Sequence, residues 1–564
     1  MSKAGLAVVA LLAAIALAIF ATTPPAPRSA TSPADAFAAG RAMADVRVIA
    51  SKPHPGASPE NAAVRAYLIK RLRAMGMEAR ESPFMGGAEA SATYARWTGE
   101  PVHRLALTNV IGVLPGKDRT LPAVALMAHH DTVWGSPGAA DDTTGVASLL
   151  EVVRAVKAGG RPRRDLVVLI TDGEELGLDG ARQFFTADPL RLHIGALINV
   201  EARGGGGRTT LFETSADNGA AIALAAGAVR KPAGSSLAVF IYKVLPNDTD
   251  LSMALALPYT AYNYAFIGRP WLYHSPKATP DALDQGSLQD MGGQVLDLTR
   301  ALLSAQQLPG IAPDVVFFDV FGLFLAVYPA WAGWPMLVIA ALALGAVTLR
   351  RPAWGTLARG AGRMIALIVL AGMMLYGLNL LSLAPGKPNY YDRLAAIPRL
   401  EIIALAGCVA AFLLTMGRWE PKPAAMAGAA LPWLLIGGAA QALAPTAAYV
   451  IVLPVMLAAL AMASTLARGI AARLVPTLFA ALVTGYMLAL GHQMMQGVGP
   501  NLPMVAVLPL GLAALAMLPL WPGVSGKMAM RAATILLLLA LGTALWVRLD
   551  PIAETVAAYQ DVKT

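Results

Sequence analysis

The sequence predicts two architectures in one chain: an α/β domain with a largely parallel central sheet flanked by helices, followed by an all-α polytopic transmembrane domain. Apolar residues make up 56% and charged residues 14% of the 564 residues, against roughly a half and a quarter in soluble globular chains. Most acidic residues and six of the seven histidines lie between residues 30 and 310, and long apolar runs dominate beyond 320. Within the first half, short apolar runs alternate with helical patterns, which is typical of βαβ units.

Four segments are expected along the chain. Residues 1–30 form an N-terminal membrane anchor or signal with a linker, residues 31–310 the soluble domain, residues 311–550 a transmembrane domain of about eight helices, and residues 551–564 a C-terminal tail. The apolar run from Ala4 to Ala21 has 18 residues, near the lower limit for a spanning helix and slightly long for a signal-peptide core. We favour a retained anchor over a cleaved signal, and in either case the soluble domain is translocated.

The first predicted element of the soluble domain is a helix over Asn61–Met75. Val64, Leu68 and Leu72 recur at helical spacing, and Gly76 follows as a suitable C-cap. Continuous apolar runs farther along the chain predict buried strands, and the segments between them predict helices. Strands are expected near 109–114, 123–127, 166–171 and 196–200, and helices over 146–156 and 175–185.

After a bridge over residues 314–321, eight apolar runs predict membrane helices, and the N-terminal run makes nine. They fall near 331–349, 364–384, 400–416, 424–443, 447–466, 474–491, 502–520 and 530–547. The runs at 424–443 and 447–466 are so close that they could instead form a re-entrant pair.

The distribution of basic residues predicts the orientation of these runs. With Met1 in the cytoplasm, ten Lys and Arg residues fall in inner loops and three in outer loops. By the positive-inside rule, the soluble domain and the C-terminal tail then lie outside the cytoplasm. Together with the Ala-rich composition, this favours a multi-pass protein of a bacterial inner membrane, with the soluble domain on the periplasmic or luminal side.

The most informative stretch follows the strand candidate at 123–127. Alternation along an extended chain turns His129 and Asp131 to one side and His130, expected to be structural, to the other. A loop rich in Gly and Pro then brings Asp141 and Asp142 to the start of an apolar helix. Imidazole nitrogen and carboxylate oxygen are ligands of Zn²⁺, so this stretch predicts a metal site. In such sheets ligands gather at the carboxyl ends of the strands, which is where the acids fall.

Three motifs in this order resemble those of the co-catalytic zinc aminopeptidase family. They are His-x-Asp at 129–131, Gly-Ala-x-Asp-Asp-x-x-Gly at 138–145 and Glu-Glu-x-Gly at 174–177. The family includes secreted bacterial aminopeptidases, glutamate carboxypeptidase and glutaminyl cyclases. The resemblance covers roughly residues 35–305 and implies a zinc exopeptidase-like fold. One catalytic domain followed by about eight spans, with Phe317-Phe-Asp-Val-Phe-Gly322 at the membrane entry, resembles the membrane-bound branch of endoplasmic-reticulum and fungal vacuolar metallopeptidases.

The resemblance also implies a ligand set for two zinc ions per catalytic domain. Asp141 would bridge the two ions. His129 and Glu201 would complete the coordination of one ion, and Glu175 and His274 that of the other.

Further roles follow from the same resemblance. Glu174 is the expected general base for a metal-bound hydroxide nucleophile. Asp131 would accept the other ring N–H of His129 and fix its tautomer. Near His274, Ala278 departs from the family pattern, in which an Asp is common.

Other polar residues have a catalytic and an ordinary interpretation. Asp250, Arg203 and Tyr273 are candidates for substrate contacts or for contacts behind the ligands, although the glycines after Arg203 fit a simple loop equally well. Asp142 is expected to cap the following helix, and Asp172 to lie in a turn.

Composition excludes several classes of protein. The single cysteine, Cys408, lies in an apolar run, so neither disulfides nor cysteine catalysis are expected in the soluble half. The net charge is +9, but the basic residues of the second half lie between apolar runs, which fits membrane topology and not nucleic-acid binding. The expected partners are a peptide substrate and the lipid bilayer, and the oligomeric state is not predicted.

The sequence therefore predicts a membrane-bound di-zinc metallopeptidase that hydrolyses peptide bonds, with an aminopeptidase preferred. The alternatives are a glutaminyl cyclase-like acyltransferase and a catalytically inactive membrane receptor or scaffold. In the membrane half, the polar candidates are Glu401, Gln441, Tyr376 and His492. No apolar run has an acid or base near its centre, which argues against an ion-coupled transporter.

Overall fold

The structure is a computed structural model and describes residues 2–349, 353–384 and 389–550. Contacts divide the chain into two compact units. The α/β unit comprises Thr23–Val327, and the helical unit joins the N-terminal helix, up to Thr22, with the residues from Tyr328 onward. The C-terminal tail predicted over 551–564 lies outside the described residues.

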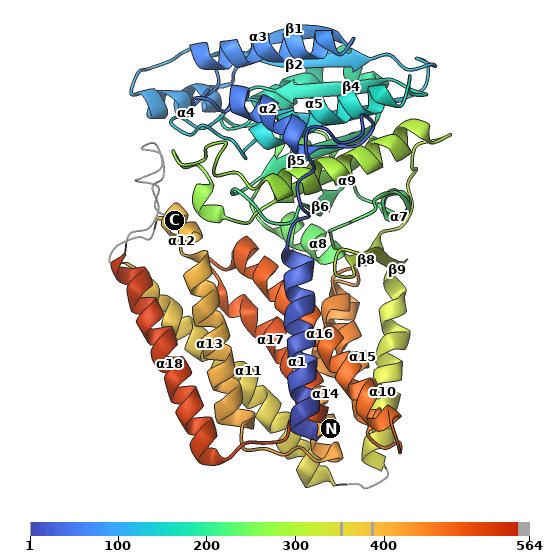
Figure 1. Ribbon diagram of the computed structural model, residues 1–564, viewed down its shortest axis with the longest axis vertical. Coiled ribbons are helices and arrows are strands. Elements are labelled where there is room, and N and C mark those ends of the chain that lie inside the picture. The colour runs from blue at the N-terminus through green and yellow to red at the C-terminus, as the bar shows by residue number, and fades with distance from the viewer. Residues whose placement is uncertain (1, 350–352, 385–388, 551–564) are drawn as a thin grey trace. The chain divides into compact units, whose positions relative to one another are not determined.

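The centre of the α/β unit is a seven-stranded mixed sheet (Figure 1). Its strands are β1 (Glu78–Met85), β2 (Ala106–Leu114), β3 (Ala123–His129), β4 (Leu166–Thr171), β5 (Ile194–Ala202), β6 (Thr210–Thr214) and β7 (Thr260–Phe266). They lie in the order β1-β2-β4-β3-β5-β7-β6. The four central strands are parallel, whereas β1, β2 and β6 pair antiparallel. The predicted α/β class is confirmed, and the antiparallel strands on both sides make the sheet mixed.

The central strands read as unbroken apolar runs because they are buried on both faces of the sheet. Every residue of β3 and β4 is buried. Successive side chains alternate between the faces, so Leu126 and Ala128 belong to the larger core cluster, while Ala125 and Met127 belong to a smaller one on the other face.

Helices cover both faces of this sheet. They are α2 (Ala39–Ile49), α3 (Pro59–Ala74), α4 (Ala88–Thr98), α5 (Thr143–Ala158), α6 (Asp179–Ala187), α7 (Gly219–Ala228), α8 (Ser236–Val244) and α9 (Gln285–Ser304), with the 3₁₀ turns η1 (Pro189–His193), η2 (Asp250–Met253) and η3 (Pro270–Leu272). Residues of α2, α5 and α9 contribute to the larger cluster, and residues of α6 and η2 to the smaller one.

Two predicted segments differ in the structure. The helix expected from residue 175 begins only at Asp179, because Gly177 and Leu178 both have positive φ and belong to a turn. The bridge over 314–321 is part of a two-stranded hairpin of β8 (Val315–Asp319) and β9 (Leu325–Pro329). Short strands of this kind carry too few alternating residues to be recognised in the sequence.

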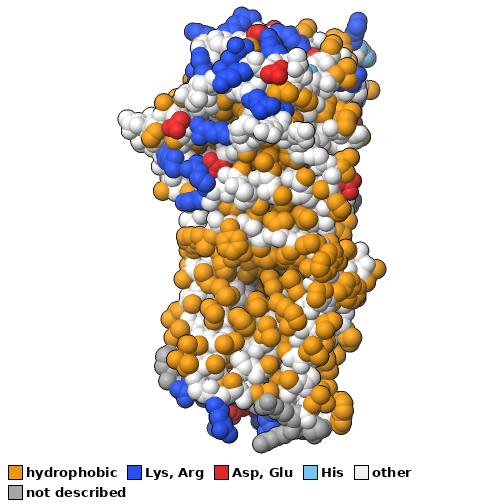
Figure 2. Space-filling view, turned by 90° about the vertical axis from the view of Figure 1, so that its right-hand side faces the viewer, with side chains coloured by type: hydrophobic (Ala, Val, Ile, Leu, Met, Phe, Trp, Pro, Cys, Tyr) orange, Lys and Arg blue, Asp and Glu red, His pale blue; other side chains and the backbone are white. Residues whose placement is uncertain are grey.

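The helical unit consists of apolar helices. They are α1 (Lys3–Thr22), η4 (Ala330–Ala332), α10 (Gly333–Leu349), α11 (Trp354–Ser382), α12 (Tyr390–Ala395), α13 (Ile397–Met416), α14 (Pro423–Leu443), α15 (Tyr449–Ser464), α16 (Ala471–Val498), η5 (Pro503–Ala506), α17 (Val507–Met517), η6 (Leu518–Leu520) and α18 (Gly526–Leu549). Within the described ranges, eight segments are long and apolar enough to cross a membrane. The run predicted over 447–466 corresponds to α15, which has 16 residues and is shorter than these. Figure 2 shows hydrophobic side chains gathered over the helical unit on the face in view, as expected for a surface in lipid.

Close packing joins the first helix to a late one. A Cβ atom at Gly485 of α16 would lie 3.0 Å from the Leu17 Cβ of α1, so the glycine permits the close approach of the two helices. On the same α16, His492 Nδ1 lies 2.6 Å from the Glu401 carboxylate of α13. Two of the polar candidates of the membrane half are therefore paired with each other.

Candidate metal centre

The predicted site residues lie at the carboxyl ends of the parallel strands and in the loops that follow them. In chain order they are His129, Asp141, Glu174, Glu175, Glu201 and His274. His129 ends β3, and Glu174 and Glu175 follow β4. Glu201 is the residue before Ala202, at which β5 ends. Parallel strands end at one edge of a sheet, so residues far apart in sequence meet there.

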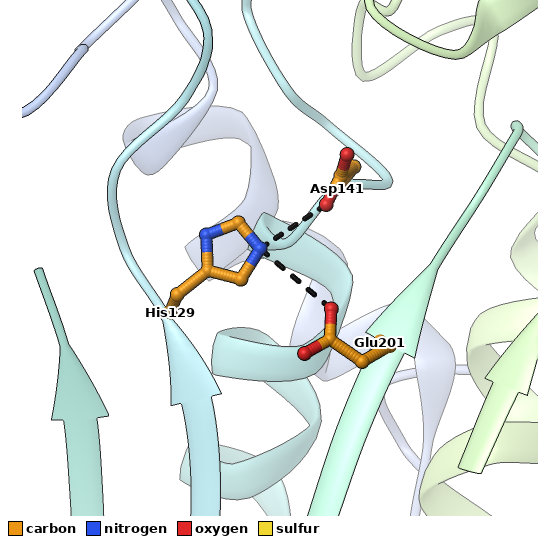
Figure 3. Close-up of side chains that lie close together, drawn as sticks. All are labelled: His129, Asp141 and Glu201. Carbon is orange, nitrogen blue, oxygen red and sulfur yellow. Dashed lines mark hydrogen bonds and ion pairs between the residues drawn. The ribbon is translucent and has the colours of Figure 1, made fainter. Parts of the chain in front are cut away.

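A first donor group consists of His129, Asp141 and Glu201 (Figure 3). His129 Nε2 lies 3.1 Å from Asp141 Oδ1 and 3.7 Å from Glu201 Oε2. The imidazole and both carboxylates point toward one another from β3, the loop before α5, and β5.

A second donor group consists of Asp141, Glu175 and His274. His274 Nε2 lies 3.3 Å from Asp141 Oδ2 and 3.2 Å from Glu175 Oε1. Asp141 therefore presents one carboxylate oxygen to each group. Within each group, the potential ligand atoms all lie within 4.8 Å of one another.

The chemistry of both groups fits zinc. Each group offers one imidazole nitrogen and two carboxylate oxygens, which are ligands that Zn²⁺ takes. Burial raises the pKa of Glu201 to about 8 and also raises the pKa of Glu175, because buried carboxylates lose solvation as anions. A divalent cation among these side chains would favour their ionised forms.

The two histidines likewise favour the ionised form of the shared Asp141. Burial disfavours the Asp141 carboxylate, but hydrogen bonding with His129 and His274 outweighs burial and lowers the pKa of Asp141 to about 2. Burial likewise disfavours the His129 imidazolium, but the neighbouring Asp131 and Asp141 raise the pKa of His129 well above its usual value.

Glu174 belongs to a third possible grouping, with His129 and Glu175. Burial, together with the nearby Glu201 and Glu175, raises the pKa of Glu174 well above its usual value, although His129 opposes this. Its carboxyl therefore lies among the proposed ligands, where it can serve as a ligand or as a base.

Asp131 is completely buried beside His129, but its carboxylate does not make the predicted contact. His129 Nδ1 lies 3.0 Å from the Asp131 main-chain oxygen and 3.6 Å from its Oδ1, so the carbonyl is the hydrogen-bond acceptor. The carboxylate instead accepts the main-chain N–H groups of Glu174 at 3.1 Å and Glu175 at 3.2 Å. Asp131 thus fixes the imidazole through its backbone and the two glutamates through its side chain.

Local backbone geometry turns two of these loops toward the site. Gly173 has φ +79, and a Cβ atom there would lie 2.7 Å from Leu107, so a glycine is needed between β4 and Glu174. His274 has φ +50, a region that costs non-glycine residues on the order of 1 kcal/mol or more and is enriched at functional sites.

Three neighbouring polar residues have structural contacts. His130 is buried, with Nδ1 3.1 Å from Asn61 Nδ2 and Nε2 3.1 Å from the Thr108 carbonyl oxygen. Asp142 caps α5 by accepting the Gly145 N–H at 3.0 Å, as expected. Asp172 is buried, and its carboxylate accepts the Thr108 N–H at 2.8 Å, so it joins two strands in addition to forming a turn.

The three candidates for substrate contacts differ in their surroundings. Asp250 is buried at the start of η2, and its Oδ2 accepts a short hydrogen bond from the Thr171 hydroxyl. The ring of Tyr273 stacks on that of His274, with centroids 3.8 Å apart. Arg203 follows β5 and is half-buried, and its main-chain N–H donates to the Phe266 carbonyl at 2.9 Å.

Two contacts of the site are not predicted from the sequence. Asn199, inside an apolar strand, donates to Glu201 Oε1 at 3.1 Å. Ser136 donates to the main-chain oxygen of Ser275, next to His274, at 2.9 Å. A single Asn in the apolar run 196–200 was the only signal for the first contact, and nothing marked the second.

An α/β sheet that ends in two donor groups with one shared aspartate offers the ligand types of a zinc centre. Residues 109–299 match the model of Peptidase family M28. The resemblance predicted from the motifs is confirmed over these residues, and the match supports a zinc metallopeptidase.

The curated relatives include endoplasmic reticulum metallopeptidases and vacuolar membrane proteases. Endoplasmic reticulum metallopeptidase 1 of Mus musculus is 32% identical over 235 residues, which cover 40% of this chain and 26% of that protein. The vacuolar membrane protease of Lachancea thermotolerans is 29% identical over 294 residues, which cover 50% of this chain and 30% of that protein. Among solved structures, the aminopeptidase from Aneurinibacillus sp. strain AM-1 is 15% identical with a TM-score of 0.39, covering 50% of this chain and 97% of that one. The chain spans about a quarter to a third of the length of these curated relatives.

Proposed function

We propose that the protein is a membrane-bound di-zinc metallopeptidase that hydrolyses peptide bonds, and that it is an aminopeptidase. The observation that carries the proposal is the position of Asp141, whose two carboxylate oxygens face different donor groups at 3.1 and 3.3 Å from the His129 and His274 nitrogens. Two zinc ions bound there would polarise the scissile carbonyl and lower the pKa of a water molecule.

In this proposal Glu174 is the general base. Glu174 is half-buried beside Glu175 and Glu201, and both its loss of solvation and these neighbours favour its protonated form. A carboxyl with a raised pKa takes up a proton more readily near neutral pH and can return it to the leaving amine. Asp131 holds the main chain of Glu174, so the base keeps its position when its charge changes.

Asp250 is proposed to bind the free amino terminus of the substrate. One of its oxygens is held by Thr171, and within the described residues the other, Oδ1, is buried without a hydrogen-bond partner. An ammonium group would supply the missing donor. Tyr273 and Arg203 are proposed to border the substrate, since Tyr273 covers the His274 ring and Arg203 follows β5 close to Glu201.

We also propose that the domain of residues 31–310 faces the periplasm or a lumen, with residues 1–30 and 311–550 in or at the membrane and the tail over 551–564 on the same side as the domain. The charge asymmetry of the loops supports this orientation. Arg350, Arg351 and Lys387, which enter the count, lie outside the described residues. In spheroplasts, an added protease should degrade the catalytic domain, and protection of the domain would contradict the orientation.

The function is tested on the full chain purified in detergent. Zinc content is measured together with the cleavage of peptides that have free or blocked amino termini. Two zinc ions per chain and cleavage of the free peptides alone are expected. Glu174→Gln should retain zinc but lose at least about 100-fold in turnover, the scale of a general base.

Other outcomes would assign a different function. Near-normal turnover of Glu174→Gln would refute the role of this residue. Conversion of an N-terminal glutaminyl peptide to the pyroglutamyl peptide with loss of ammonia, and without hydrolysis of a peptide bond, would indicate a cyclase. The absence of bound zinc would leave a receptor or scaffold.

A further inference from the structure

A row of polar side chains crosses three strands of the sheet beside the metal centre. Asn199 of β5 is in register with Asn263 of β7, which is in register with Glu213 of β6. Residues in register across neighbouring strands point to the same face. Asn199 and Asn263 are completely buried, and Glu213 is 5% exposed. Two residues earlier on the same face, β5 and β7 carry Leu197 and Ala261, which are part of the apolar core.

Hydrogen bonds connect this row to Glu201. Asn199 Nδ2 donates to Glu201 Oε1 at 3.1 Å and to Asn263 Oδ1 at 3.0 Å. Asn263 Nδ2 in turn donates to Glu213 Oε2 at 2.8 Å and to Thr249 Oγ1 at 2.9 Å. The carboxylate of Glu213 is thereby linked to that of Glu201 through two amides.

The two carboxylates determine how both amides are oriented. Both Asn residues turn their NH₂ groups toward the acid beside them, the orientation that suits a carboxylate, which only accepts hydrogen bonds when ionised; a zinc ion would favour that form of Glu201. A flipped Asn199 would place its oxygen against both Glu201 and the Asn263 oxygen. A flipped Asn263 would place its oxygen against Glu213. The row therefore has one direction, set at its far end by Glu213.

This direction matters for Glu201 because its two oxygens have different tasks. Oε1 is held by Asn199, which leaves Oε2 facing His129 Nε2 at 3.7 Å. Glu201 belongs only to the first donor group, with His129 and Asp141. The row thus reaches the metal centre through a ligand of one ion and not of the other.

Packing alone is a poor reason for such a row. Apolar residues would fill these positions at lower cost, because buried polar groups must find partners and a buried carboxylate loses solvation. Burial indeed raises the pKa of Glu213, although its bond from Asn263 opposes this.

We propose that Asn199, Asn263 and Glu213 are positioning residues that orient Glu201, so that its Oε2 atom is presented to the ion of the first donor group. The inference rests on the proposed function. It adds that Glu213 of β6, the strand beyond β7 in the sheet, affects the coordination of one of the two proposed zinc ions.

The test measures zinc affinity, not turnover. The full chain in detergent is stripped of metal and titrated with Zn²⁺ against a chelating indicator, and with Co²⁺ while the absorption of the bound ion is recorded. Asn199→Leu should lower the affinity for one of the two ions by about 10- to 100-fold, the usual effect of losing a residue that orients a ligand. Glu213→Met should lower the affinity for the same ion and change the spectrum of Co²⁺ bound there. Glu213→Gln keeps an acceptor for Asn263, so its affinity and spectrum should match those of the wild type.

Tyr262→Phe is the matched control. Tyr262 precedes Asn263 on β7, faces the larger core cluster and donates from its buried hydroxyl to the Ala221 carbonyl at 3.0 Å. The variant loses one buried hydrogen bond of the same strand and should bind both ions like the wild type.

The outcomes separate the row from the proposed function. Unchanged affinity in both Asn199→Leu and Glu213→Met, or equal weakening of both ions, would overturn the positioning role. A wild-type chain that binds a single ion would refute the two-zinc function. In that case a lower affinity for the ion in Asn199→Leu would support the positioning role, and an unchanged affinity would refute it. A chain that binds no ion would refute both.

Discussion

Asp131 shows how one residue can hold several residues of a proposed site. Its carboxylate accepts the N–H groups of Glu174 and Glu175, and its main-chain oxygen accepts from His129. An Asn side chain has the same shape, but its NH₂ group cannot accept a hydrogen bond. One of the two glutamate N–H groups would then face another donor.

We therefore expect Asp131→Asn to lower zinc affinity by about 10- to 100-fold, as changes behind metal ligands usually do. Zinc titration checks this. Asp179→Asn is the control, because Asp179 also accepts a main-chain N–H, that of Gly87 at 2.6 Å, but belongs to none of the donor groups. Wild-type affinity in Asp131→Asn would show that the carboxylate does not hold these glutamates.

A second residue-scale prediction concerns acid stability. His54 is 1% exposed, and its Nδ1 donates to the Lys52 carbonyl at 2.9 Å. Burial lowers the pKa of His54 from 6.5 to about 4, against the effect of that hydrogen bond. The unfolded chain then binds more protons than the folded chain between these values, so stability is complete above pH 6.5 and is lost as the pH falls toward 4.

The loss attributable to His54 is on the order of 3 kcal/mol. His54→Asn keeps a donor for Lys52 but does not titrate. The difference in thermal midpoint between wild type and variant should shift in favour of the variant from pH 7 to pH 4.5. Parallel midpoints over that range would contradict a buried neutral imidazole.

At the scale of the element, alanine substitutions at two adjacent glycines in α9 are expected to have opposite effects on stability. A Cβ atom at Gly292 would lie 1.9 Å from Cε2 of Phe37, whereas one at Gly293 would meet no described atom within 4 Å. Gly292→Ala should therefore destabilise the α/β unit by about 1–3 kcal/mol through overpacking. Gly293→Ala should stabilise the unit by up to about 1 kcal/mol, because alanine favours the helix. Denaturant unfolding of both variants measures this, and equal effects would mean that Phe37 does not contact α9 as described.

The elements also show what the sequence could and could not predict. β3, β4 and β5 were recognised because parallel strands in the centre of a sheet are apolar on both faces, and their ends located the ligands. β1 was missed because its residues alternate between half-buried and exposed without a consistent apolar side. The role of Asn199 needed the register with β7, which no local pattern contains. The contact of Asp131 with His129 is implied by the family motif, and that motif does not reveal the turn that brings the Glu174 N–H to the Asp131 carboxylate.

At the scale of the whole molecule, metal removal should act on the α/β unit. Its site gathers Asp141, Glu175 and Glu201 around two histidines, and under the proposed function these carboxylates would lose their cations when zinc is chelated. A ligand at 100 times its Kd stabilises the folded state by about 2.7 kcal/mol. Excess chelator should therefore lower the thermal midpoint followed by near-ultraviolet circular dichroism, and zinc should restore it.

His274→Ala provides the control, since this variant should respond less to both additions. Identical midpoints with and without chelator in the wild-type chain would show that the site holds no metal that matters for folding.

The connectivity of the two units has one more consequence. The residues Thr23–Val327 are enclosed by the chain, because helices of the other unit precede and follow them. A protease that cuts the mostly exposed linker over 23–30 would still leave this unit joined to α10 through β9. Release of the α/β unit would require a second cut near Pro329, so a single cut at either connection leaves the unit attached to the rest of the chain.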